Sequence, residues 1–397
     1  MRRLLLILLF LPAAFSAETD TLLVLPFFNL SEKSDLAWIG ESISETLRDV
    51  AQGEGMLVLD REAQRESYRR LSIRQNARLT KASVIKVGQA LDAARVLCGE
   101  YEFHTVIGSL AGSRGTLRIS VRLMDLKRWT PAREWTEMGP LENLAAMEGR
   151  LAWQALGELA PAQKTSEEEF RARRPALRVD AMESYIRGLQ ASDEDQKIRF
   201  FTRAARLEEH FSPPRFQLGR LYVSRKEYRD AADWLAQVKP ESPHYYHASF
   251  LLGLCRYYIA DYPGAEKAFR LVAEAVPLNE VFNNLGAAEV RRDPAQALED
   301  FRKALAGDAS DPAYHFNVGY ALWKKGEFAA AADSFRAVLD RTPDDALAIA
   351  MLGRCLKQAG PRPGDARTEN IERLKDTYEE TAFRQLRAEL EPAAKAK

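Results

Sequence analysis

The fold is decided by the stretch GYALWKKGEFAAAADSFRAVLDRTP, which occupies residues 319–343. Its pattern recurs along the chain every 33 or 34 residues, and each copy starts from a glycine inside a helical pattern. These glycines are Gly219, Gly253, Gly286, Gly319 and Gly353. A glycine within a helix costs about 0.8–1 kcal/mol relative to alanine. Glycines in register therefore need a packing reason, which is the close approach of a neighbouring helix.

Small and large apolar residues follow these glycines at fixed offsets. The small ones, where a second helix would touch the first, are Ala231, Ala265, Ala297 and Ala331. The large ones, which would fill the space between helix layers, are Leu235, Phe269, Phe301 and Phe335. Proline closes most units, at Pro243, Pro277 and Pro343. The unit around Gly286 departs from the pattern, because its turn is one residue shorter and Ala309 replaces the proline.

This pattern resembles the tetratricopeptide repeat (TPR), a helix–turn–helix unit with small residues at the helix contact and a closing proline. The segment from Asp180 to Phe211 fits as a degenerate first repeat, since Gly188, Phe201 and Ala204 match but the turn is short. The resemblance implies an all-α solenoid over residues 176–360. Such a solenoid presents an extended binding surface rather than a catalytic centre.

The region before the repeats has strand patterns as well as helical ones. Residues 21–28 form a continuous apolar run, as expected of a strand buried on both faces. Further strands are expected at 56–59, 94–103, 116–124 and around 133–136, with a hairpin turn at 112–115. Helical patterns lie at about 35–52, after Asp60, at 80–91 and at 141–159. The predicted fold class is thus an α/β N-terminal domain, a single sheet with helices, followed by the all-α TPR solenoid.

Several motifs of this region are similar to the TolB-like N-terminal domain, which is related to domains of curli-secretion proteins. They are LVLPFFNL at 23–30, WIGE at 38–41, ISETL at 43–47, ARVLCGEY at 94–101 and LRISVRLMD at 117–125. The resemblance implies an envelope location and a role in protein binding or assembly. It carries no chemistry with it.

The ends and joints of the chain complete the predicted organisation. Residues 1–17 resemble a cleavable signal peptide, with Arg2 and Arg3 before a short apolar run and no cysteine that could carry a lipid. This predicts a periplasmic or secreted protein with no integral membrane segment after cleavage. The α/β domain spans 20–160, a charged linker 161–175, a capping helix 368–390 and a disordered tail 391–397. The capping helix is expected to pack Ile371, Leu374, Tyr378, Phe383 and Leu386 on one side.

Composition limits the classes of function. The chain has 57 basic and 57 acidic residues, so its formal net charge is zero and no global field recruits nucleic acid. Its cysteines, Cys98, Cys255 and Cys355, are expected to be buried free thiols.

A binding groove is predicted from the repeat register, because the first helix of each TPR lines the inner surface. The candidate groove residues are Phe216, Arg220, Phe250, Tyr257, Tyr258, Asn283, Arg291, Phe316, Tyr320, Trp323, Lys324 and Arg354. This aromatic and basic lining suits protein or peptide segments with apolar and acidic residues. The Lys/Asn clamp that some TPRs use for acidic C-termini is not matched: Asn284 and Asn317 fit, but Asn283 and Phe316 replace the basic partners.

Two alternatives stay open at this stage. In one, the protein is an envelope assembly or secretion accessory that forms a homo-oligomer through the α/β domain, with the TPRs only structural. In the other, it is an enzyme with an inter-domain site. No catalytic, cofactor or metal site is expected, because no phosphate-binding loop or nucleophile motif appears and His244 and His247 lack further ligands at suitable spacing.

Overall fold

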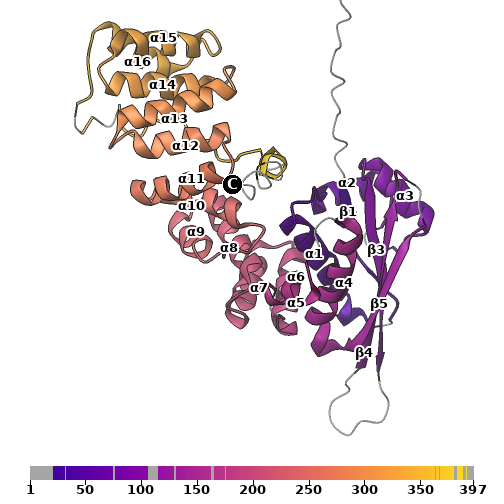
Figure 1. The fold of residues 1–397 in the computed structure, drawn as a ribbon. Helices are drawn as coiled ribbons and strands as arrows, with labels where there is room; N and C mark the ends of the chain where they lie inside the picture. Colours follow the sequence, from indigo (N-terminus) through magenta and orange to yellow (C-terminus); the bar gives the residue numbers. More distant parts are fainter. Residues whose placement is uncertain are drawn as a thin grey trace, which may run out of the picture.

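The computed structural model describes residues 21–390 except for 32, 75–76, 106–114, 129–130, 162–164, 175, 363, 366, 380–381 and 388–389. The predicted signal peptide, hairpin turn and disordered tail lie outside the described residues. The chain forms a sheet-containing domain followed by a curved stack of helix pairs, as Figure 1 shows. This is the predicted fold class.

The sheet has parallel and antiparallel parts. Strands β1 (Leu22–Val24) and β2 (Phe28–Asn29) both pair in parallel with β3 (Arg95–Thr105). Strands β3, β4 (Gly115–Asp125) and β5 (Arg133–Pro140) form an antiparallel meander. The predicted strand at 21–28 is divided because Pro26 has no N–H for the ladder. The predicted strand at 56–59 is wrong, since only Val58 makes a single bridge to Leu22.

Helices cover both faces of the sheet. Leu22 and Val24 face the core formed with α1 (Trp38–Gly53) and α4 (Leu144–Leu159). Leu23 faces the opposite core, formed with α2 (Arg61–Arg70) and α3 (Lys81–Ala90). Short 3-10 turns, η1 (Ser34–Leu36) and η2 (Leu141–Asn143), precede α1 and α4. The continuous apolar run of β1 therefore reflects burial on both faces, as predicted.

Consecutive helices of the solenoid pack as antiparallel pairs. After α5 (Glu167–Ala172), the pairs are α6 (Val179–Gln190) with α7 (Glu194–Leu207), α8 (Ser212–Ser224) with α9 (Tyr228–Leu235), α10 (Tyr245–Tyr258) with α11 (Tyr262–Ala275), α12 (Asn279–Glu289) with α13 (Pro294–Gly307), and α14 (Pro312–Lys324) with α15 (Phe328–Leu339). Helix α16 (Ala346–Leu356) occupies the position of the first helix of a further repeat. These elements follow the predicted register.

The repeat glycines do what the sequence indicates. A Cβ on Gly253 would lie 2.7 Å from Cε1 of Phe269, the large residue at the fixed offset. In the described residues no second helix pairs with α16 in the way that α15 pairs with α14, and a Cβ on Gly353 would meet nothing within 4 Å. The glycine is therefore required where a helix pair closes and is dispensable in α16.

The two parts of the chain share one hydrophobic core. Ile43 and Leu47 of α1, with Leu151 of α4, belong to the same buried cluster as Phe201 of α7 and Leu218 of α8. Phe170, within the predicted charged linker, is also buried in this cluster. The first repeats thus pack directly on the α/β domain, which closes the N-terminal end of the solenoid.

The predicted capping helix 368–390 is wrong in its first half. The described residues from 368 to 379 contain no helix, and the helical residues described in the predicted range are 382–387 and 390. Asn370 has a positive φ of 58°, which a continuing helix does not allow. The backbone groups that a helix would satisfy internally are bound instead by asparagine side chains of the solenoid.

Candidate functional site

The concave face of the solenoid is occupied by the chain itself. The described residues of 365–379, here called the C-terminal segment, run from beside α16 back toward the N-terminal repeats. The Arg354 guanidinium lies 2.9 Å from a carboxylate oxygen of Asp365, and the Tyr320 hydroxyl donates to the carbonyl of Thr368 at 2.7 Å. Farther along, the Tyr378 ring packs edge-on against Phe250 with centroids 5.0 Å apart. We call the face lined by the first helices α10, α12, α14 and α16 the groove.

Asparagine amides hold the backbone of the C-terminal segment. Asn317 Nδ2 donates to the carbonyl of Arg373 at 2.8 Å, and the Arg373 N–H donates to Asn317 Oδ1 at 2.9 Å. Asn284 makes the same pair of bonds with Lys375, both at 2.8 Å. Asn283 adds a bond to the Arg373 carbonyl at 2.7 Å and accepts one from Asn317 at 2.7 Å. Residues two apart in an extended chain present N–H and C=O to the same side, which is the geometry that these amides read.

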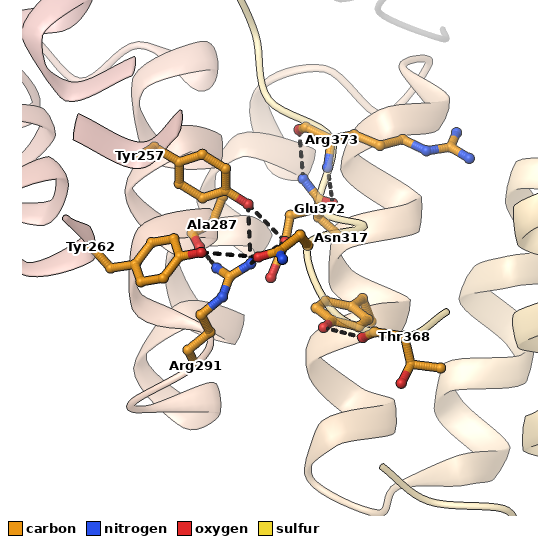
Figure 2. Close-up of polar contacts among 10 residues, drawn as sticks. Tyr257, Tyr262, Ala287, Arg291, Asn317, Thr368, Glu372 and Arg373 are labelled. Carbon is orange, nitrogen blue, oxygen red and sulfur yellow. Dashed lines mark hydrogen bonds and ion pairs between the residues drawn. The ribbon is translucent and has the colours of Figure 1, made fainter. Parts of the chain in front are cut away.

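Glu372, which precedes Arg373 in the C-terminal segment, has a buried carboxylate that contacts Tyr257 of α10. Glu372 Oε2 accepts from the Tyr257 hydroxyl at 2.7 Å and pairs with the Arg291 guanidinium at 2.9 Å (Figure 2). The Glu372 side chain has no exposed surface. Burial and the charge of Glu372 raise the pKa of Tyr257 well above its usual range, so the phenol remains a donor. Burial alone would lower the pKa of Arg291, but Glu372 and Tyr257 raise it, which keeps the cation in place.

Arg291 also organises the neighbouring contacts. Its guanidinium lies over the Tyr262 ring, 4.1 Å from the centroid, and donates to Asn370 Oδ1 at 2.5 Å. The Tyr262 hydroxyl donates to the same oxygen at 3.0 Å. One cation of the solenoid therefore fixes two side chains, Asn370 and Glu372, of the C-terminal segment.

Two acidic side chains of the solenoid meet basic side chains of the segment. The Arg373 guanidinium lies over the Phe316 ring, 4.0 Å from the centroid, and pairs with Asp345 at 2.6 Å. The Lys375 ammonium pairs with Asp311 and lies 4.9 Å from the Tyr314 centroid. The groove thus offers the segment two cations, Arg291 and Arg354, and two acids, and it is not a uniformly basic surface.

Most of the predicted groove residues line this face, and the segment covers many of them. Those that contact it are Phe250, Tyr257, Tyr258, Asn283, Arg291, Phe316, Tyr320 and Arg354. Trp323 is fully buried and donates to the carbonyl of Ala359 at 2.8 Å, and Lys324 lies 5.3 Å from the Tyr320 centroid. Tyr258 stays the most open of the aromatic residues, with 45% of its surface exposed.

Phe216 and Arg220 lie away from the described C-terminal segment contacts. Phe216 is buried and stacks on His244 with centroids 4.4 Å apart. Arg220 is exposed, with its guanidinium 5.8 Å from the Phe216 centroid. Among the described contacts, the two predicted groove residues of α8 therefore take no part in holding the C-terminal segment.

Sequence reasoning missed the acids and the role of the asparagines. Asn284 and Asn317 do not form a clamp for a terminal carboxylate, but each binds the backbone N–H and C=O of one residue. A signal was present, since Asn284 and Asn317 occupy equivalent positions in adjacent repeats, two residues before Gly286 and Gly319. Asp311 and Asp345 precede α14 and α16, where their carboxylates also cap the helix N-termini. Because an aspartate at a helix N-terminus is explained by capping alone, the sequence did not identify these two residues as groove residues.

A second hollow lies between the α/β domain and the first repeats. It has a volume of about 600 Å³ and is lined in part by Glu45, Asp49, Glu148 and Tyr185. Glu45 pairs with Arg48 and accepts from the Tyr185 hydroxyl at 3.3 Å. Thr46 donates to Glu148 Oε2 at 2.5 Å. These contacts link α1 to α4 and α6, so they have a structural explanation.

His244 and His247 act as packing residues. Both rings contact Phe216, and His247 also packs against Tyr378. Among the residues that the structure describes, no cluster of three or more His, Cys, Asp or Glu side chains has the arrangement of a metal site. No helix in that part of the chain has both the length and the apolar character needed to cross a bilayer.

The repeats, their register and the groove define a TPR solenoid, a fold whose stacked repeats present an extended concave surface. Residues 287–346 match the tetratricopeptide repeat family model. No curated protein sequence shows significant similarity to the chain.

Several solved TPR structures resemble the helical part. MamA from Desulfovibrio magneticus RS-1, residues 41 to the end, is 23% identical over 40% of this chain and 92% of that chain, with a TM-score of 0.37. YrrB, described as a TPR protein with an unusual peptide-binding site, is 21% identical over 43% and 87%, with a TM-score of 0.35. The Pseudomonas aeruginosa pilF protein is 17% identical over 45% and 87%, with a TM-score of 0.36.

Proposed function

We propose that this protein is a periplasmic or secreted scaffold that binds an extended segment of a partner protein in the groove. One observation carries the proposal: Asn284 and Asn317 each exchange two hydrogen bonds with the N–H and C=O of one residue of an extended chain. Such pairs recognise an extended backbone whatever its side chains are. Affinity then comes from the main chain and specificity from the side-chain seats beside it.

The burial of these amides supports a recognition role. Asn283, Asn284 and Asn317 have no exposed surface when the segment is bound. A ligand that buries these amides must also pair with them, because a buried amide without hydrogen-bond partners costs about 1–3 kcal/mol. An empty groove would therefore leave three amides to water, whereas any extended chain in the groove would satisfy them.

The envelope location is supported by the sequence of residues 1–17 and by the TolB-like motifs of the α/β domain. Fractionation of cells that carry the full chain tests it. Mature protein lacking about 17 residues in the periplasmic or extracellular fraction is the expected result, and full-length protein in the cytoplasm would contradict it.

A photo-crosslinking amino acid at Tyr258 tests the groove. This position is exposed and borders the C-terminal segment, 3.5 Å from Asp376 through its hydroxyl. The matched control places the same amino acid at Asp233, an exposed position on α9. A partner crosslinked at Tyr258 and not at Asp233 should then bind the purified chain, and Asn317→Ala should weaken that binding. Crosslinks only between copies of this chain would favour the alternative of a homo-oligomer with structural TPRs.

A further inference from the structure

The C-terminal segment has the features of a bound ligand. It is extended where the groove asparagines bind it, and its side chains enter separate seats. Glu372 meets Arg291 and Tyr257, while Arg373 and Lys375 meet Asp345 and Asp311. The segment is joined to α16 by only a few residues, because Asp365 already contacts Arg354. A ligand tethered this closely is present at an effective concentration on the order of millimolar.

We propose that the C-terminal segment is a built-in competitor, which fills the groove until a partner segment of the same chemistry displaces it. This inference rests on the proposed function, because it assumes that the groove binds extended segments of other proteins. The segment would set a threshold, so that only partners able to outcompete a tethered ligand gain the groove.

The fit of the segment leaves room for a better ligand. Glu372 Oε1 is buried and has no hydrogen-bond partner among the described residues, although Oε2 has two. Tyr258, next to Asp376, reaches it with a hydroxyl contact of only 3.5 Å and remains partly exposed. A partner that satisfies these positions more fully would have an advantage over the segment itself.

The seats define the chemistry of that partner. It would be extended, with a carboxylate at the position of Glu372. Basic residues one and three positions later would pair with Asp345 and Asp311. A side-chain oxygen two positions earlier would take the place of Asn370 beside Tyr262 and Arg291. An aromatic residue six positions after the carboxylate would replace Tyr378 against Phe250. The charges required of the partner are thus mixed, and a purely acidic segment would be repelled by Asp311 and Asp345.

The test uses the full chain and a labelled synthetic peptide with the sequence of residues 365–390. The peptide is titrated against the unaltered chain, the Glu372→Gln chain and the Glu379→Gln chain. Glu372→Gln weakens the built-in segment at its buried seat without changing the groove, and Glu379 is an exposed matched control. We expect Glu372→Gln to bind the peptide at least about tenfold more tightly than the other two, because hydrogen bonds to charged groups are the strong ones. Adding Asn284→Ala and Asn317→Ala to Glu372→Gln should abolish that gain.

The outcomes separate the two proposals. If all three chains bind the peptide equally and tightly through the asparagines, the groove is a peptide site but the segment does not block it, and the competitor inference is wrong. If the folded Glu372→Gln chain binds no peptide, the proposed function falls as well. If Glu372→Gln instead exchanges its segment with a second copy, seen as a dimer by light scattering, the natural occupant is another copy of this chain.

A measurement on the unaltered chain covers the case in which Glu372→Gln does not fold. Millimolar peptide should speed hydrogen–deuterium exchange at the Arg373 and Lys375 amides, which Asn317 and Asn284 protect. Unchanged exchange with the peptide bound elsewhere would overturn the inference.

Discussion

The side-chain amide of Asn317 and the backbone of Arg373 exchange two hydrogen bonds, at 2.8 and 2.9 Å, across 56 residues of sequence. A buried residue of α14 thereby pairs with the chain as an adjacent strand would. This relationship converts a helical surface into a site for an extended backbone. It also gives the C-terminal segment an order that its own sequence does not provide.

Replacement of Asn317 by alanine should loosen the C-terminal segment. Each lost hydrogen bond is worth about 0.5–1.5 kcal/mol, so exchange at the Arg373 amide should rise about tenfold or more. Hydrogen–deuterium exchange followed by mass spectrometry measures this. The control is Asn143→Ala, an exposed asparagine of η2, which should leave exchange in the segment unchanged. Equal protection in both variants would show that the amide pair does not hold the segment.

The glycine register makes a paired prediction. Gly253→Ala places a methyl group against the buried ring of Phe269 and should lower the free energy of unfolding by about 1–3 kcal/mol. Gly353→Ala meets nothing within 4 Å and should raise it by up to about 1 kcal/mol through helix propensity. Urea unfolding of both variants measures the difference. Similar effects at the two sites would contradict the packing explanation.

The sequence predicted those elements that depend on local packing patterns, and it failed where the conformation depends on contacts between distant residues. The repeat glycines and the alternation in β4 each report a local packing requirement, so α6 to α16 and the β3–β4–β5 meander could be predicted. Ile371, Leu374 and Tyr378 are spaced three and four residues apart, as on an amphipathic helix, yet they pack from an extended chain. The contacts that select the extended conformation over the helix come from Asn284 and Asn317, about 60–90 residues away in the sequence. Local periodicity contains no trace of such a contact.

The aromatic groove residues should separate into structural and accessible ones. Trp323 has no exposed surface, so Trp323→Ala should cost about 3–5 kcal/mol of stability. Tyr258→Ala should cost about 1 kcal/mol, the worth of its stacking on Tyr228. Thermal unfolding distinguishes them. A small effect at Trp323 would show that the predicted groove aromatics are free to serve a ligand.

Glu148 should make stability depend on pH. Burial raises its pKa from 4.5 to about 7, so the folded state keeps a proton that the unfolded state releases. The folded protein therefore loses stability as pH rises from about 4.5 to about 7, by up to roughly 3 kcal/mol. Glu148→Gln should remove this dependence and be the more stable protein at pH 8, with little difference at pH 4.

Unfolding free energies measured at several pH values test this, with the exposed Glu142→Gln as control. If Glu148→Gln and Glu142→Gln follow the same pH profile as the unaltered chain, the carboxyl of Glu148 is ionised in the folded protein and the prediction is wrong.

The shared core predicts where the chain can be cut. A fragment of residues 21–160 would expose the faces of α1 and α4 that pack against α6, α7 and α8, including Ile43 and Leu151. It should associate or unfold without a cooperative transition. A fragment ending after α9 retains Phe201, Leu218 and the partly buried Trp234 and should unfold cooperatively. Light scattering and calorimetry compare the two, and a stable monomeric 21–160 fragment would refute the shared core.

The return path of the C-terminal segment ends beside the other domain. Phe383 and Arg384 border the same small hollow as Gln52, Gly53 and Gly55 at the end of α1, and Tyr246 packs on Phe383 with centroids 5.6 Å apart. Figure 1 shows the last helical turn lying between the solenoid and the α/β domain. The segment is therefore a tie between the two parts of the molecule. An arriving partner that lifts it would also untie the joint, so the α/β domain could sense remotely that the solenoid has been engaged.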